Sequence, residues 1–305
     1  MDKEKTYVSA VVYLRNCAAD AQKYLPRLAE ALDLCFENSE IVLVNDCSSD
    51  DTADVAKKCA EGAFFTMPVT LGSMSIFQGT ELCMTAGVDA AIGDFVFEFD
   101  TLCPIDEKLM RRVYETSLEG FDIVNVSPEQ NRSRTSGYFY KIFNACSNSQ
   151  YKLHTDIFRL LSRRAINRVR SMSKAPVYRK AAYASSGLKM TTVFEPSLSA
   201  EKSKSKLRLN LAVDSLALYT DAAYRLSLGI SLLMLTGTFA EILYTVIIYL
   251  GGSKPIEGWT TTMLVLTIGF FGVFLILTLI LKYVSLLVNL VFKNNHYLVE
   301  NIEKL

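Results

Sequence analysis

The chain has 305 residues, half of them hydrophobic, and its 32 Lys and Arg residues balance its 32 Asp and Glu residues. This length allows one domain of ordinary size together with a membrane module, and zero net charge provides no overall field that would favour nucleic acid. The seven cysteines are odd in number and include no C-x-x-C pair. The cysteines therefore indicate neither a disulfide framework nor a zinc site, and they favour reduced thiols in a cytosolic domain.

Short apolar runs alternate with helical patterns over the first two-thirds of the chain. β-Branched and aromatic runs predict strands over 7–14, 40–45, 63–69, 94–100 and 121–126. Three- and four-residue apolar spacing and capping residues predict helices over 18–38, 55–60, 74–91 and 106–117. This alternation predicts an α/β fold, with a mostly parallel sheet covered by helices on both faces.

The last third contains two long apolar runs, 226–250 and 259–292. Each is long enough to cross a hydrocarbon core of about 30 Å at about 1.5 Å per residue. Only the residues 251–257 separate them, so we expect a two-helix transmembrane hairpin. Glu241 lies inside the first run, where a carboxylate is costly in lipid, and we expect it to face a partner helix or another subunit.

A basic cluster precedes the first apolar run and consists of Lys202, Lys204, Lys206 and Arg208. Positive charge on this side of the run predicts that the α/β domain and both termini are cytoplasmic. The organisation expected is a catalytic domain over 1–196, a basic and amphipathic interfacial segment over 197–224, a membrane hairpin over 225–292 and a tail over 293–305. An ordinary packed helix within 197–224 remains an alternative.

Three acidic residues end predicted strands, at the edge of an α/β sheet where ligands bind. Asp46 ends the second strand, whereas Glu98 and Asp100 are two residues apart at the end of the fourth. In an extended chain this spacing directs both side chains to one face. Paired carboxylates can hold a divalent cation, which in turn binds a diphosphate. A solvated turn is the alternative explanation for an acidic residue at a strand end.

Five segments resemble, in the same order, motifs of family 2 glycosyltransferases with the GT-A fold. They are AVVYLRN at 10–16, VNDCSSDDT at 44–52, GDFVFEFD at 93–100 with Pro104 after it, DIFRLLSR at 156–163 and PIEGW at 255–259. The last two resemble the branch of that family that uses polyprenyl phosphate or dolichyl phosphate.

The resemblance implies a membrane-anchored, inverting enzyme that moves a hexose from a UDP- or GDP-sugar to a polyprenyl phosphate. It also implies Mg²⁺ or Mn²⁺ as cofactor, a bacterial plasma membrane as location, and a homo-oligomer for which a tetramer is possible. The donor would be bound by Asn16, Asp46, Glu98 and Asp100, with Asp100 and Glu98 also holding the metal.

The resemblance further assigns catalysis to Asp156 and Arg159. Arg132 and Arg134 would contact the acceptor phosphate, and the basic cluster at 202–208 would contact the membrane surface. The motifs also depart from the family: the first metal carboxylate is Glu98, Leu102 replaces a polar residue, and Cys47 replaces a glycine. These departures leave open a catalytically degenerate relative that serves as a nucleotide-binding or scaffold membrane protein, and another enzyme with a diacylglycerol or ceramide acceptor.

Overall fold

The computed structural model describes residues 3–62, 65–129, 140–141, 143–145, 151–172, 178–196, 198, 229–230, 232–234, 236–237, 240, 258–292 and 297–305. The chain forms two compact units. The first comprises Met1–Leu211 and Asn295–Leu305, and the second comprises Ala212–Asn294.

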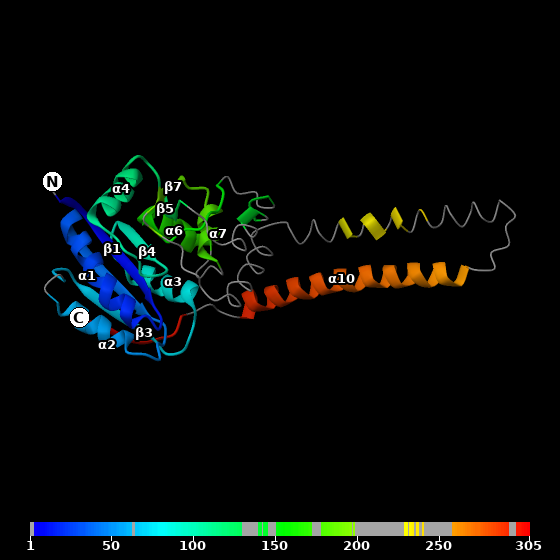
Figure 1. The fold of residues 1–305 in the computed structure, drawn as a ribbon, viewed down its shortest axis with the longest axis horizontal. Coiled ribbons are helices and arrows are strands. Elements are labelled where there is room, and N and C mark those ends of the chain that lie inside the picture. Colours follow the sequence, from blue (N-terminus) through cyan, green and yellow to red (C-terminus); the bar gives the residue numbers. More distant parts are fainter. Residues whose placement is uncertain are drawn as a thin grey trace. The chain divides into compact units, whose positions relative to one another are not determined.

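A single eight-stranded sheet forms the centre of the first unit, with the strand order β7-β5-β6-β4-β1-β2-β3-β8 (Figure 1). The strands are β1 Glu4–Leu14, β2 Phe36–Asn45, β3 Val69–Met74, β4 Phe95–Phe99, β5 Ile123–Pro128, β6 Phe158–Ser162, β7 Met190–Glu195 and β8 Val299–Lys304. The pairs β1–β2, β1–β4, β2–β3 and β5–β7 are parallel, whereas β6 and β8 run antiparallel to their neighbours. The predicted mostly parallel sheet is therefore confirmed.

Helices cover both faces of this sheet. They are α1 Ala18–Cys35, α2 Thr52–Ala60, α3 Thr80–Ala90, α4 Glu107–Leu118, α6 Arg163–Met172 and α7 Arg179–Ala184. On one face, Val8, Ala10 and Val12 of β1 are fully buried in a core that also contains Leu25 of α1. Val11, which lies between these residues on β1, points to the other face and toward α3. A Cβ on Gly87 of α3 would lie only 2.3 Å from Val11 Cγ1. Glycine thus lets α3 approach the second face of the sheet closely.

Three predicted elements differ from the structure. The third strand is β3 at Val69–Met74 and not 63–69, and the helix that follows it begins at Thr80 and not at residue 74. Gly79 precedes that helix with φ +84°, a backbone conformation that no helix contains. The first helix ends at Cys35 because Phe36 is already extended and begins β2.

The C-terminal residues add a strand that the sequence did not indicate. β8 pairs antiparallel with β3, and its Glu303 forms an ion pair of 2.6 Å with Lys57 of α2. The chain accordingly ends beside α2 (Figure 1). Part of the segment predicted as a cytoplasmic tail over 293–305 therefore forms an edge strand of the sheet in the first unit.

The second unit contains α10, Gly258–Phe292, and a described part of the preceding apolar run that is also helical. A Cβ on Gly272 would lie 2.9 Å from three atoms of Met234, so the two runs are in contact at this point. Across the residues that the structure describes, no helix combines the length and the apolarity that crossing a membrane requires. Most of the predicted first span, including Glu241, lies outside the described residues.

Candidate active site

Two loops at the carboxyl ends of β1 and β2 contain the first group of predicted donor residues. Asn16 and Cys47 both have left-handed backbones, with φ of 47° and 51°. The side-chain Oδ1 of Asn16 accepts a hydrogen bond of 2.8 Å from the backbone N–H of Ser49. The Asn16 side chain therefore joins the two loops, and the left-handed backbone at Cys47 is a conformation that glycine adopts more readily than cysteine.

Asp46 directly follows β2, close to its predicted place at the end of the strand, but its carboxylate points into the protein and is fully buried. It accepts hydrogen bonds from the backbone N–H groups of Gln78 (2.8 Å) and Gly79 (3.0 Å), and from the hydroxyl of Tyr13 (2.8 Å). Asp46 therefore fixes the backbone at the start of α3. Its contact with a donor base stays a prediction.

Glu98, Asp100 and Arg159 meet because β4 and β6 are adjacent and place Glu98 opposite Arg159. Arg159 Nη1 lies 3.0 Å from Glu98 Oε2, Arg159 Nη2 lies 2.8 Å from Asp100 Oδ2, and Arg159 Nε lies 3.1 Å from Asp156 Oδ2. The Arg159 side chain is only 1% exposed. The structure thus brings together the predicted metal carboxylates and both predicted catalytic residues.

A second buried guanidinium, from Arg179 at the start of α7, binds the same two carboxylates. Its Nη1 lies 2.8 Å from Glu98 Oε2, and its Nη2 lies 2.5 Å from Asp100 Oδ1. Its Nε donates to Glu81 of α3 at 3.0 Å, while the Tyr183 hydroxyl donates to Glu98 Oε1 at 2.7 Å. We call Glu98, Asp100, Arg159 and Arg179 the arginine–carboxylate cluster.

Burial and ion pairing oppose each other in this cluster. Burial by itself raises the pKa of Asp100, but the charges of Arg179 and Arg159 hold that pKa well below its usual range. Burial also acts to lower the pKa of Arg179, whereas the charges of Glu98 and Asp100 raise it well above its ordinary value. For Tyr183, burial and then the charge of Glu98 raise the pKa of the hydroxyl. The cluster therefore holds an ionised Asp100 between two charged guanidiniums, beside a neutral Tyr183.

The cluster does not fit a divalent cation in this arrangement. All four carboxylate oxygens of Glu98 and Asp100 already face a guanidinium or the Tyr183 hydroxyl. A cation would have to displace these donors from the same lone pairs and lie beside two positive charges. Within the described part of the chain, no group of three or more His, Cys, Asp or Glu side chains could hold a metal ion.

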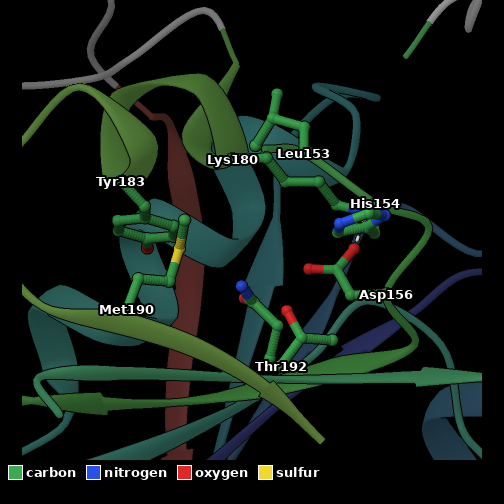
Figure 2. Close-up of a pocket in the computed structure, with 8 residues that line it drawn as sticks. Leu153, His154, Asp156, Lys180, Tyr183, Met190 and Thr192 are labelled. Carbon is green, nitrogen blue, oxygen red and sulfur yellow. Dashed lines mark ion pairs between the residues drawn. The ribbon is translucent and has the colours of Figure 1, made fainter. Parts of the chain in front are cut away.

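A shallow pocket adjoins the cluster, with an empty volume of about 310 Å³ that includes open solvent. Its lining residues are Asn125, Leu153, His154, Asp156, Lys180, Tyr183, Met190 and Thr192. Figure 2 shows Asp156 and His154 side by side, with Lys180 reaching toward them from α7. The ammonium group of Lys180 forms an ion pair with Asp156, whose side chain is 5% exposed. The pocket thus contains an ammonium group that is paired with a predicted catalytic residue.

The other predicted phosphate and membrane contacts lie outside the described residues. These are Arg132, Arg134, Lys202, Lys204, Lys206 and Arg208.

Sequence reasoning missed Arg179, Lys180, Glu81 and Tyr183, all of which contact the predicted site. The sequence does contain one signal for an additional cation. Glu98 lies inside the apolar strand FVFEF, and a buried carboxylate requires a cationic partner. The sequence alone does not show which arginine supplies that charge.

The profile of Glycosyl transferase family 2 matches residues 9–183, more than half of the chain. The chain belongs to this family. It is a glycosyltransferase, and its α/β fold is of the GT-A type.

Two curated relatives and one solved structure describe the similarity further. The chain is 24% identical over 288 residues to the glycosyltransferase YkcC of Bacillus subtilis, covering 91% of this chain and 88% of that protein. It is 26% identical over 180 residues to the prophage bactoprenol glucosyl transferase homolog of Escherichia coli, covering 57% and 58%. Glucosyl-3-phosphoglycerate synthase from Mycobacterium tuberculosis, crystallised with Mn²⁺, UDP and phosphoglyceric acid, gives a TM-score of 0.50 at 13% identity, covering 70% of this chain and 76% of that one. At this identity the structural likeness concerns the fold alone.

Proposed function

We propose that this glycosyltransferase moves a hexose from a nucleotide diphosphate sugar to a polyprenyl phosphate, with inversion at the anomeric carbon. The observation that carries the proposal is the pocket in which Lys180 faces Asp156, directly beside the buried guanidiniums of Arg159 and Arg179. The ammonium group of Lys180 and the neighbouring pair of guanidiniums suit a reaction between two phosphate compounds, the donor diphosphate and the acceptor phosphate. Bactoprenol in the name of the Escherichia coli relative supports a polyprenyl acceptor.

The proposed reaction needs orientation of the acceptor more than removal of a proton. A phosphate monoester is already an anion near neutral pH, so one of its oxygens can attack the anomeric carbon directly. The bond from that carbon to the diphosphate oxygen breaks, and its electron pair leaves with the nucleotide diphosphate. Lys180 would hold the acceptor phosphate in the pocket, while Asp156 fixes the ammonium group of Lys180 and the guanidinium of Arg159.

We also propose that the second unit holds the enzyme at the cytoplasmic face of a bacterial plasma membrane, where the lipid acceptor lies. The apolar sequence of 226–250 and 259–292 supports this proposal. So does the exposure of large apolar side chains along α10, because such a surface is unfavourable in water. Those exposed by more than half include Leu266, Phe270, Phe271, Val273, Phe274, Ile280 and Leu287. Homo-oligomer formation would cover part of this surface.

A transfer assay tests the proposed function. The purified full chain in detergent is mixed with undecaprenyl phosphate and labelled UDP- and GDP-sugars, and the lipid is then extracted. We expect label in the organic phase with one of the donors. Lys180→Met should reduce transfer by about tenfold or more, because a charge-assisted hydrogen bond contributes about 1.5–3 kcal/mol.

Lys189→Met is the matched control, because Lys189 is exposed and is not a pocket residue. This variant should retain full transfer. Folded protein that transfers no sugar from any donor would reject the proposed reaction and would favour the scaffold interpretation.

A further inference from the structure

The two carboxylates that were expected to bind a metal instead hold two arginines. Resting on the proposed function, we propose that Arg159 and Arg179 take the place of a divalent cation at the donor diphosphate, so that the nucleotide binds without metal. In this proposal Glu98 and Asp100 are positioning residues for the guanidiniums.

The geometry of the cluster supports a prepared pair of cations. Asp100 accepts from both arginines, one on each oxygen, at 2.5 Å and 2.8 Å. Glu98 Oε2 is likewise shared by both, at 2.8 Å and 3.0 Å. The two guanidiniums, whose side chains are 1% and 2% exposed, are thus fixed from two different elements, β6 and α7. Such fixed planar groups match phosphate oxygens better than flexible lysine chains do.

Solvent reaches this cluster at Asp100, next to the buried guanidinium of Arg179. Asp100 is its accessible member, with a side chain 23% exposed, while Glu98 is fully buried. Among the described residues, Nη1 of Arg179 is a buried nitrogen that makes no hydrogen bond, although it lies near Glu98 Oε2. Because this nitrogen is held by charge attraction to Glu98 and not by an aligned hydrogen bond, it can turn to donate to a new anionic partner while Arg179 Nε keeps its bond to Glu81. A diphosphate that enters beside Asp100 would supply that partner.

Ion pairing within the cluster also leaves its carboxylates little free charge with which to attract a metal ion. Glu81, Glu98, Asp100 and Asp156 face the cations Arg159, Arg179 and Lys180, which leaves one negative charge in this neighbourhood. The carboxylates are thus largely neutralised before any ligand binds. A metal ion would gain little attraction from them and would be repelled by the guanidiniums.

The test measures binding of Mn²⁺ alone, of UDP and of GDP to the full chain in detergent. Mn²⁺ binding is followed by electron paramagnetic resonance, and nucleotide binding by calorimetry in EDTA or in Mn²⁺. We expect no bound Mn²⁺ in the absence of nucleotide, and at least one nucleotide whose dissociation constant agrees within about threefold between EDTA and Mn²⁺.

Arg179→Met gives the decisive comparison because it removes the charge and frees oxygens of Glu98 and Asp100. We expect this variant to lose about tenfold or more of nucleotide affinity in EDTA and to recover affinity in Mn²⁺, together with a new bound-Mn²⁺ signal. A merely structural ion pair would not convert the protein to metal-dependent binding. If Arg179→Met does not fold, Arg179→Lys serves instead, because it keeps the charge but loses the planar fork and should bind in EDTA with reduced affinity. Arg164→Met is the matched control, since Arg164 is 69% exposed and pairs with Asp122 outside the cluster.

Nucleotide binding that requires Mn²⁺ in the unaltered protein would overturn this proposal and leave the proposed function intact. Binding in EDTA without any sugar transfer to undecaprenyl phosphate would keep the proposal and reject the proposed acceptor. If neither nucleotide binds under either condition, the metal-free donor site and the proposed donor class both fail.

Discussion

Asp46 shows how one buried carboxylate can position the backbone around a site. Its two carboxylate oxygens accept three hydrogen bonds, from Tyr13, Gln78 and Gly79, and no part of the residue is exposed. These bonds join the end of β2 to the start of α3. Since α3 also carries Glu81, which holds Arg179, the position of the arginine–carboxylate cluster depends in part on Asp46.

Removing the Asp46 carboxylate should therefore destabilise the first unit. We expect Asp46→Ala to lower the free energy of unfolding by about 2–4 kcal/mol, because each buried donor left unsatisfied costs about 1–3 kcal/mol. Denaturant titration measures this change. Asp51→Ala is the control: Asp51 is exposed and makes no side-chain cap bond to α2, so we expect a change of about 0.5 kcal/mol or less. Equal effects of the two substitutions would show that the bonds of Asp46 contribute little.

Asp100 makes stability depend on pH in a defined direction. Burial acts to raise its pKa, but Arg179 and Arg159 lower it below the ordinary Asp value of about 3.9. A carboxylate with a depressed pKa in the folded state contributes stability above the ordinary pKa and loses it as the pH falls through the depressed value. The difference in Tm between the unaltered protein and Asp100→Asn should thus be largest near about pH 7 and shrink below about pH 4. Thermal melts across this range measure it, and a constant difference would contradict the ion-pair assignment.

For single residues, the sequence predicted which side chains belong to the site, but it did not predict the ion pairs that they form with one another. Strand-end position and alternation correctly brought Glu98 and Asp100 to one face, and the motif at 156–163 brought Asp156 and Arg159 beside them. The two guanidiniums on these carboxylates were not predicted. Arg179 is distant in sequence from β4, and the sequence around an arginine does not show whether its side chain is buried or exposed.

Among the elements, β8 has the least expected position. It covers β3, which would otherwise be an edge of the sheet, and the residue before it is tied to the site. The backbone N–H and carbonyl of Leu298 exchange hydrogen bonds with the side chain of Gln78, at 2.9 Å and 2.7 Å. Because the backbone of Gln78 binds Asp46, the C-terminal segment supports the same loop that Asp46 fixes.

Deletion of Tyr297–Leu305 should expose the edge of β3 and release Gln78. We expect a lower Tm, faster amide exchange in β3 and a greater tendency to aggregate, because an uncovered edge strand can pair with another chain. Hydrogen–deuterium exchange and light scattering measure these effects. Glu300→Ala, at an exposed position of β8, should leave all three unchanged. A deletion variant with unchanged exchange in β3 would show that β8 is dispensable.

The boundaries of the elements show where sequence patterns are strong and where they fail. The predicted strands over 7–14, 40–45, 94–100 and 121–126 correspond to β1, β2, β4 and β5, because runs rich in β-branched and aromatic residues determine them. The amphiphilic strand β8, with the sequence VENIEK, has no such run and is fixed by pairing with β3. Its partner is more than two hundred residues away, so local periodicity contains no information about it.

At the scale of the whole molecule, the chain forms two compact units. A substitution inside one unit should therefore change the packing of that unit alone. Within the second unit, Gly272 contacts Met234, whereas a Cβ on Gly269 would have open space around it. A leucine at 272 would therefore enter space that Met234 occupies, while a leucine at 269 would not. Overfilling of a packed contact costs about 1–3 kcal/mol.

We therefore expect Gly272→Leu to separate the two apolar runs and Gly269→Leu to leave them together. Hydrogen–deuterium exchange in detergent reports this directly, through peptides that cover 229–240 and 258–292. Exchange should rise in both peptides for Gly272→Leu and stay unchanged for Gly269→Leu. Peptides from β1 and β4 should be unaffected in either variant, because the first unit has its own core. If both leucine variants exchange alike, the close approach at Gly272 does not hold the hairpin together. If β1 and β4 also lose protection, the two units fold as one, and the second unit contributes to the stability of the first.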